Sequence, residues 1–288
     1  MTPKMNRPLV TVLLLSLLGG FCGLAQSSHD DADHVPPGRY LTPVFNTNQF
    51  LGNLVYGPRV IDPKTAQPID LKLNLFLPPK EDANPKRPLI IFIHGGGFTG
   101  GEAGNEHFPW GVTRARMGYV CASITYRLSK KEDDHALKLN RAVADTEQAI
   151  RWLREHATQY GIDPNRIALE GCSAGGFTSL GVAYDPVDGK FDPGILAVGD
   201  MWGGMDTNKL QAGGAPICII HGTADPLVPI AGAKAIRDRA AVVGIPCEYH
   251  AFEGYGHELR DSSGRNHPSE LSLPILTRFY AKYLAKVE

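Results

Sequence analysis

The chain has 288 residues, of which 43% are hydrophobic and 20% are charged, and its formal net charge is −1. This is the composition of an ordinary globular protein, and a chain of this length can bury a full core without stabilising disulfides or metals. A net charge near zero provides no bulk attraction to nucleic acid or to an anionic membrane. We therefore expect neither as a partner.

The first 25 residues have the pattern of a secretory signal peptide. Lys4 and Arg7 make a basic start, Leu9–Leu18 is apolar, and small residues precede a cleavage position after Ala25. The pattern predicts a secreted or periplasmic protein without stable membrane association after cleavage. Two alternatives stay open: a membrane anchor, for which the apolar run is short against the roughly 20 residues of a span, and a lipoprotein signal at Cys22, whose preceding residues fit poorly.

Cleavage after the signal leaves the cysteines Cys121, Cys172, Cys218 and Cys247. Export permits disulfides, but these cysteines lie in or beside apolar, strand-like runs, where free buried thiols are the commoner outcome. The sequence has no C-x-x-C pair and no histidine-rich cluster, so we expect neither a metal nor another cofactor.

Strand and helix patterns organise the rest of the chain. Residues 26–54 are polar and turn-rich, and we expect them to cover the surface. The alternation in Ile69–Leu77 predicts a half-exposed strand, whereas the continuous apolar run Leu89–Ile93 predicts a strand buried on both faces. An apolar stripe predicts a helix over 142–160 that Gly161 ends. The mixed-sign run Lys130–Asp134 reads as a solvated loop.

Shorter patterns continue this alternation to the C-terminus. Strands are expected at 119–124, 166–170, 195–198, 217–220 and 247–252, and helices from 173 onward, near 231–243 and near 271–285. Alternating strands and helices indicate a doubly wound, mostly parallel sheet with helices on both faces, in one domain at 55–288. Too few residues separate the strands at 195–198 and 217–220 for a substantial cap domain.

The segment Gly171–Gly175 reads G-x-S-x-G and lies between a predicted strand and a predicted helix. A turn this sharp crowds the backbone, so the neighbours of the central residue must be small. Such a turn raises the hydroxyl of Ser173 above the sheet, and the following helix N-terminus favours nearby negative charge. A chance match is the alternative, and the flanking elements argue against it.

The glycine run His94–Gly97 ends the strand predicted at Leu89–Ile93. Successive glycines let the backbone approach a substrate and turn its N–H groups inward. Donors aimed at a developing oxyanion lower the barrier to acyl transfer. We assign the N–H groups of Gly96, Gly97 and Ala174 to an oxyanion hole, and expect His94 to brace the loop.

A serine nucleophile needs a base, and in this arrangement an acid follows the serine and a histidine follows the acid. Asp225 follows one late strand and His257 follows the last, which gives the order Ser, Asp, His. Other candidates remain for both roles. They are His221, His250 and His267 for the base, and Asp200 and Asp206 for the acid.

Together these motifs resemble the bacterial HGGG carboxylesterases, which include the hormone-sensitive-lipase-like group and the acetyl and feruloyl esterases of plant-polysaccharide breakdown. The motifs that carry the resemblance are His94–Gly97, Asp145–Leu153, Asp163–Ile167, Gly171–Gly176, the Asp225 loop and Gly256–His257. The resemblance implies an α/β-hydrolase fold with an eight-stranded sheet. Thr125–Ser129 departs from the acidic segment usual in the lipase-like group, and the helical N-terminal cap of that group is missing. Both departures favour the capless, secreted carbohydrate-esterase type.

The expected function is therefore hydrolysis of carboxylic esters through an acyl-enzyme on Ser173. The substrate is expected to be a small-molecule or polysaccharide-linked ester with a short acyl, acetyl or feruloyl group. The aromatic residues Phe98, Trp110, Trp202 and Tyr255 are candidates for substrate binding, with ordinary packing as their alternative. A serine peptidase of the same fold and a non-catalytic binding protein on a hydrolase scaffold remain as alternative functions.

Overall fold

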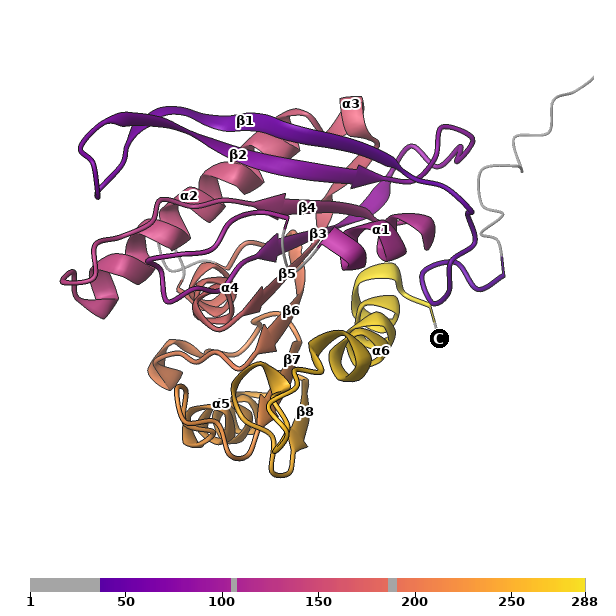
Figure 1. The fold of residues 1–288 in the computed structure, drawn as a ribbon. Coiled ribbons are helices and arrows are strands. Elements are labelled where there is room, and N and C mark those ends of the chain that lie inside the picture. The colour runs from indigo at the N-terminus through magenta and orange to yellow at the C-terminus, as the bar shows by residue number, and fades with distance from the viewer. Residues whose placement is uncertain (1–36, 105–107, 186–190, 288) are drawn as a thin grey trace, which may run out of the picture. The chain divides into compact units, whose positions relative to one another are not determined.

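Eight strands form one mixed sheet in the order β1-β2-β4-β3-β5-β6-β7-β8 (Figure 1). The strands are β1 (Gln49–Ile61), β2 (Pro68–Leu77), β3 (Arg87–Ile93), β4 (Val120–Ile124), β5 (Ile162–Cys172), β6 (Ile195–Met201), β7 (Ile217–Gly222) and β8 (Cys247–Phe252). β2 is antiparallel to both of its neighbours, and the strands from β4 to β8 are parallel to one another. The expected α/β-hydrolase fold is confirmed. This computed structural model describes residues 37–104, 108–185 and 191–287, so the predicted signal peptide lies outside them.

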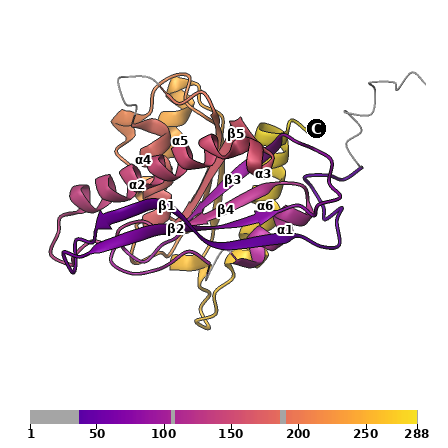
Figure 2. The same cartoon turned by 90° about the horizontal axis from the view of Figure 1, so that it is seen from above.

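Helices cover both faces of the sheet, as expected. They are α1 (Phe108–Arg116), α2 (His135–Glu155), α3 (Ala157–Tyr160), α4 (Ala174–Tyr184), α5 (Ala231–Val243) and α6 (Pro268–Tyr280), with short turns η3 (Thr207–Lys209), η4 (His257–Leu259) and η5 (Ala281–Ala285). Figure 2 shows α2, α4 and α5 on one face and α1 and α6 on the other. Within the described ranges, no helix combines the length and apolar character needed to span a bilayer.

The central strand β3 shows why this sheet is buried on both sides. Leu89, Ile91 and Ile93 belong to the apolar cluster under α2, α4 and α5, whereas Ile90 and Phe92 belong to the cluster under α1 and α6. All five side chains are fully buried. Successive strand residues point to opposite faces, so a strand covered on both faces needs a continuous apolar run.

Helix α2 begins seven residues before the expected start, at His135. The reason is an N-cap: the Asp134 carboxylate accepts a hydrogen bond of 2.8 Å from the backbone N–H of Leu137. The end of the run Lys130–Asp134 is therefore a capping position. Gly161 closes the helical segment in a left-handed conformation with φ of 64°, as its sequence position predicts.

The described part of the segment 26–54 is built into the domain. β1 begins at Gln49, so the boundary expected at residue 55 falls inside a strand. Before it, Arg39 and Tyr40 are buried, and the Arg39 guanidinium donates two hydrogen bonds of 2.9 and 2.8 Å to Asp82. Arginine is usually exposed, so a buried and paired arginine such as Arg39 cannot be recognised from the sequence. For this reason the sequence predicted a surface segment.

β1 forms one edge of the sheet and is irregular along its length. Its pairing with β2 is interrupted by three register shifts, and Asn53 and Arg59 have positive φ. Pro58 lies within it, and Phe50 is 46% exposed. These interruptions explain why no strand pattern is visible in this part of the sequence.

Candidate active site

Ser173 occupies a strained turn between β5 and α4. Its φ of 53° and ψ of −119° lie outside the regions that L-residues usually adopt. A side chain at Gly171 would place Cβ 2.1 Å from the carbonyl oxygen of Gly175, and one at Gly175 would place it 1.9 Å from that of Ile93. Both glycines are therefore required by close backbone approach, as the G-x-S-x-G pattern predicted.

Three side chains from different loops form a continuous hydrogen-bond chain. Ser173 Oγ lies 3.1 Å from His257 Nε2, and His257 Nδ1 lies 2.7 Å from Asp225 Oδ2. The other carboxylate oxygen, Oδ1, accepts hydrogen bonds from the backbone N–H groups of Leu227 and Val228. An ionised carboxylate only accepts, so Nδ1 carries the proton and Nε2 is left to accept the serine proton.

His221, at the end of β7, supports the loop that carries the acid. Its Nε2 lies 2.8 Å from the Val228 carbonyl oxygen and 3.4 Å from Asp225 Oδ2. Burial lowers the pKa of His221, which favours the neutral ring. A neutral ring with its proton on Nε2 donates to the Val228 carbonyl and holds the carboxylate loop in place.

The other sequence candidates lie in different roles. His250 lies within β8, and His267 is paired with Asp261 and Glu270. Asp206 caps η3. Asp200 is fully buried and accepts a hydrogen bond from the Gly203 N–H, and burial raises its pKa to about 7. The structure brings Asp225, and not these carboxylates, to His257.

The loop after β3 places its backbone beside Ser173. Gly96 and Gly97 have φ values of 96° and 59°, and both line the same cavity as Ser173 and Ala174. The carbonyl of Gly96 accepts hydrogen bonds from two following N–H groups, which closes a tight turn. This arrangement brings together the three residues whose N–H groups we assigned to the oxyanion.

His94 and Tyr126 brace that loop from beneath. Their rings stack with centroids 4.3 Å apart, and the Tyr126 hydroxyl lies within hydrogen-bond distance of the carbonyls of His94 and Gly95. Burial lowers the pKa of His94, which favours the neutral ring. His94 has the bracing position expected from its sequence context.

One cavity is lined by Ser173, and a second lies next to it. The outer cleft has a volume of about 560 Å³ and is lined by Gly95, Gly96, Gly97, Phe98, His135, Lys138, Cys172, Ser173, Ala174, Phe177, Trp202, Leu227, Val228, His257 and Glu258. The inner pocket has a volume of about 200 Å³ and is lined by Trp110, Cys172, Met201, Trp202, Glu258, Asn266 and Pro268. Cys172, Trp202 and Glu258 line both, so the cavities meet beside the nucleophile.

Three of the four aromatic candidates line these cavities. Phe98 lines the outer cleft, Trp202 lines both cavities, and Trp110 lines the inner pocket, where its Nε1–H donates to Ser269 Oγ. Tyr255 lines neither, which corrects the expectation for this residue. Its ring packs against Phe252 and His267 instead.

Sequence reasoning missed several polar lining residues, among them His135, Lys138 and Glu258. The His135 ring lies edge-on to Phe177 and to Phe98, with centroid distances of 5.2 and 5.5 Å. Its position was hidden by the late helix start expected for α2. Glu258 follows His257 directly, and that adjacency was the available signal.

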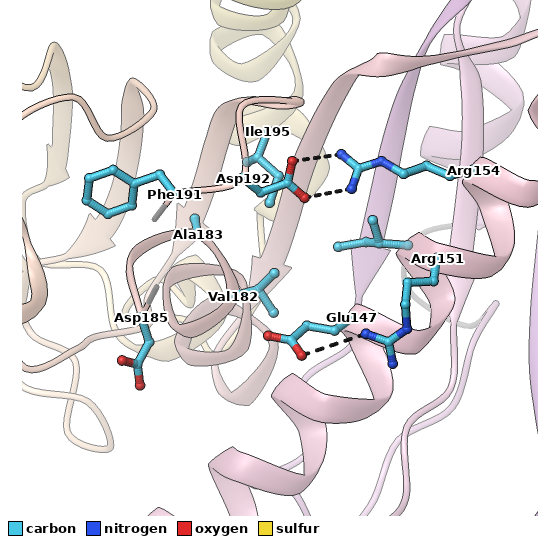
Figure 3. A pocket seen from close by; sticks show the side chains of 10 residues that line it. Glu147, Arg151, Arg154, Val182, Ala183, Asp185, Phe191, Asp192 and Ile195 are labelled. Atoms are coloured by element: carbon cyan, nitrogen blue, oxygen red, sulfur yellow. Dashed lines mark hydrogen bonds and ion pairs between the residues drawn. The ribbon is translucent and has the colours of Figure 1, made fainter. Parts of the chain in front are cut away.

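A further pocket lies at the other end of the parallel strands. It is lined by ten residues of α2, α4 and the start of β6, among them the ion pairs Arg154–Asp192 at 2.7 Å and Arg151–Glu147 at 4.0 Å (Figure 3). Ile195, in its lining, begins β6, whereas Ser173 follows the carboxyl end of β5. Ligands of open α/β sheets bind at the carboxyl ends, so this pocket is not the active site.

Within the described ranges no disulfide joins the cysteines, and Cys121, Cys172 and Cys218 are buried. In the described ranges, the group able to hold a metal is Cys218, Glu248 and His250, whose ligand atoms lie within 4.8 Å of one another. Lys282 Nζ already lies 3.6 Å from Glu248, and this positive charge opposes a cation there.

The sheet, the serine turn and the hydrogen-bond chain from Ser173 through His257 to Asp225 form the arrangement typical of serine hydrolases with the α/β-hydrolase fold. Several known proteins are similar to this chain. The BD-FAE family model matches residues 73–199. Probable carboxylic ester hydrolase LipM of Mycobacterium tuberculosis is 26% identical over 64% of this chain and 54% of its own length. Neuroligin-2 of Homo sapiens is 35% identical over 42% of this chain and 15% of its own length.

Among solved structures, Thermogutta terrifontis esterase 2, phosphonylated by cyclosarin, has a TM-score of 0.67 and 25% identity. That likeness covers 80% of this chain and 93% of the esterase. The chain spans about half the length of LipM. The chain has the α/β-hydrolase fold and is similar to carboxylic ester hydrolases.

Proposed function

We propose that this protein is a serine esterase that hydrolyses carboxylic esters through an acyl-enzyme on Ser173. The observation that supports this most is the continuous chain from Ser173 Oγ through His257 to Asp225. His257 Nε2 takes the serine proton as Oγ attacks the ester carbonyl carbon. Asp225 holds the imidazole in the reactive tautomer and stabilises the imidazolium that forms.

The developing oxyanion is stabilised by the N–H groups of Gly96, Gly97 and Ala174, each donor contributing about 3–4 kcal/mol in comparable sites. His257 then gives its proton to the leaving alcohol. In the second half of the cycle it activates a water molecule, which attacks the acyl carbon and regenerates Ser173. The residues of this chain supply every proton transfer in this cycle.

The inner pocket favours a short acyl group. Its volume of about 200 Å³ is less than half of the outer cleft's volume of about 560 Å³. That space accepts acetyl to butyryl chains. A feruloyl group, with a substituted ring and a three-carbon arm, needs the larger outer cleft. We therefore propose short-chain acyl esters, with a small or polysaccharide-linked alcohol in the outer cleft, in a secreted or periplasmic protein as residues 1–25 suggest.

The test compares wild type with Ser173→Ala on p-nitrophenyl acetate, butyrate and octanoate. We expect acetate and butyrate to be preferred over octanoate, and the variant to lose at least about 10⁴-fold in kcat. Ser179→Ala is the matched control, because Ser179 is a buried serine on α4 whose Oγ has no hydrogen-bond partner within the described ranges. Equal hydrolysis by wild type and Ser173→Ala would refute the assignment of the nucleophile.

Natural esters then separate the acyl groups. Acetate release from acetylated xylan without ferulate release from feruloylated xylan supports the short-acyl proposal. Efficient ferulate release would contradict the assignment of the acyl group to the inner pocket while leaving the esterase proposal intact.

A further inference from the structure

The residues directly after His257 have an unusual backbone. Glu258 and Leu259 have φ values of 59° and 50°, so two consecutive residues other than glycine adopt the left-handed region. Each such residue costs on the order of 1 kcal/mol or more, and this strain persists only where the surroundings hold it. Leu259 is fully buried and supplies that hold. The strained backbone turns the Glu258 side chain to the two cavities.

The segment 260–268 that follows forms a wall of the inner pocket and is held by several contacts. The Gly256 N–H donates to the Arg260 carbonyl at 2.7 Å, and Arg260 forms a bridge with Asn266. At its far end, His267 pairs through Nε2 with Asp261 and through Nδ1 with a glutamate at the start of α6. The wall therefore has supports at both ends, and Asn266 and Pro268 from it line the inner pocket.

The Glu258 carboxylate stands where the cavities meet. It lines both, and Asn266 Nδ2 donates a hydrogen bond of 2.7 Å to its Oε2. Arg260 Nη2, at 3.8 Å, is a second and looser neighbour. Glu258 is the one carboxylate among the residues that line the inner pocket, whose other walls are largely apolar. A carboxylate has about four acceptor positions, so one oxygen remains able to accept from a ligand.

A neutral hydrogen-bond donor and an anion meet Glu258 differently. A hydroxyl or amide group beside the scissile bond can donate a hydrogen bond to Oε1 of the Glu258 carboxylate. A carboxylate at the same place has no proton to donate, and the like charge of Glu258 repels it.

We propose that Glu258 is a specificity-determining residue, which selects neutral esters carrying a hydroxyl or amide donor and disfavours esters carrying a carboxylate. This proposal rests on the esterase function proposed above. An amide and a carboxylate have similar shapes, so pocket volume alone cannot separate esters that carry them. A preference for the amide ester over the carboxylate ester therefore reports the negative charge of Glu258.

The experiment uses Glu258→Gln, which keeps the side-chain shape and an acceptor oxygen for Asn266. Values of kcat/KM are measured for 4-acetoxybenzamide and 4-acetoxybenzoate, two acetates that differ in charge. We expect the amide-to-benzoate ratio to fall about fivefold in the variant, the effect of two unit charges about 4 Å apart in water. Glu253→Gln is the control, because Glu253 is exposed and lines neither cavity. A ratio within twofold of wild type in Glu258→Gln overturns the proposal.

Binding of the product alcohols gives a readout that does not need turnover. Trp202 lines both cavities, so its fluorescence reports occupancy of the outer cleft beside Glu258. We expect 4-hydroxybenzamide to bind wild type more tightly than 4-hydroxybenzoate, and Glu258→Gln to reduce the difference. If wild type hydrolyses no ester and also binds the two alcohols equally, both proposals fail. If wild type hydrolyses no ester but still binds 4-hydroxybenzamide more tightly, only the esterase proposal is refuted.

Discussion

The replacement Gly175→Ala tests how closely the nucleophile turn and the oxyanion loop are packed. The new Cβ would lie 1.9 Å from the carbonyl oxygen of Ile93, whereas ordinary contacts begin at 3.4 Å. To remove this overlap between Cβ and the carbonyl oxygen, the start of α4 and the end of β3 must separate by more than about one ångström. Ser173 lies two residues before Gly175, and Gly96 lies three residues after Ile93, so the separation moves the nucleophile away from the oxyanion donors.

Two magnitudes follow from this displacement. Overpacking of a tight site costs about 1–3 kcal/mol of stability, and each kcal/mol lowers Tm by about 2–4 °C in a domain of this size. A misplacement of about 1 Å at a reacting centre costs about 10²-fold in rate. We expect Gly175→Ala to show both effects, with the loss mainly in kcat because substrate binding in the outer cleft is less affected.

The measurements are Tm from circular dichroism and kcat/KM on p-nitrophenyl acetate. Gly232→Ala is the matched control: Gly232 lies in the first turn of α5, and a Cβ there meets nothing within 4 Å. In this control we expect unchanged activity and a stability gain of up to about 0.5–1 kcal/mol. A Gly175→Ala protein with activity within threefold and Tm within about 1 °C of wild type would refute the packing argument.

Further predictions concern the acid, a buried carboxyl and a buried ion pair. Asp225→Asn presents an amide N–H to His257 and selects the wrong tautomer, so kcat on p-nitrophenyl acetate should fall about 10⁴-fold with an unchanged circular dichroism spectrum; a loss under tenfold would contradict this. Burial raises the pKa of Asp200 from 3.8 to about 7, so its protonated form stabilises the fold and that contribution is lost as pH rises from the lower to the higher value. Asp200→Asn should therefore flatten the fall in Tm over this range, and an unchanged slope would count against the shift. Arg114 and Glu170 form a fully buried ion pair at 2.6 Å, so Arg114→Met should cost about 3–5 kcal/mol in urea unfolding, and adding Glu170→Gln should restore part of it; a single variant as stable as wild type would disprove a buried charge there.

Strand and helix positions were predictable where one physical signal dominated. β8 and α5 lie where expected, at Cys247–Phe252 and Ala231–Val243, because each is a single clear pattern between turn residues. β1 was missed because an irregular edge strand has little alternation. The start of α2 was missed because a cap at Asp134 in a charged run resembles a loop.

For the site, chain order was enough to select candidates but not to choose among them. Asp200 and Asp225 both follow strands, and only the distance to His257 separates them. Tyr255 was misjudged because its ring packs against Phe252 and His267, a contact that chain order does not predict. Glu258 was overlooked because its position depends on a positive φ, which no pattern of residue types predicts for a glutamate.

The irregular edge strand β1 has a consequence for the protein at high concentration. A long, regular edge offers a row of unpaired N–H and C=O groups to a second chain, and strand-to-strand aggregation follows. Here three register shifts and Pro58, which lacks an N–H, break that row, even though Phe50 and Leu51 expose apolar surface beside it. The irregularity of β1 thus makes this edge of the sheet a poor template for pairing with a strand of a second molecule, which limits self-association.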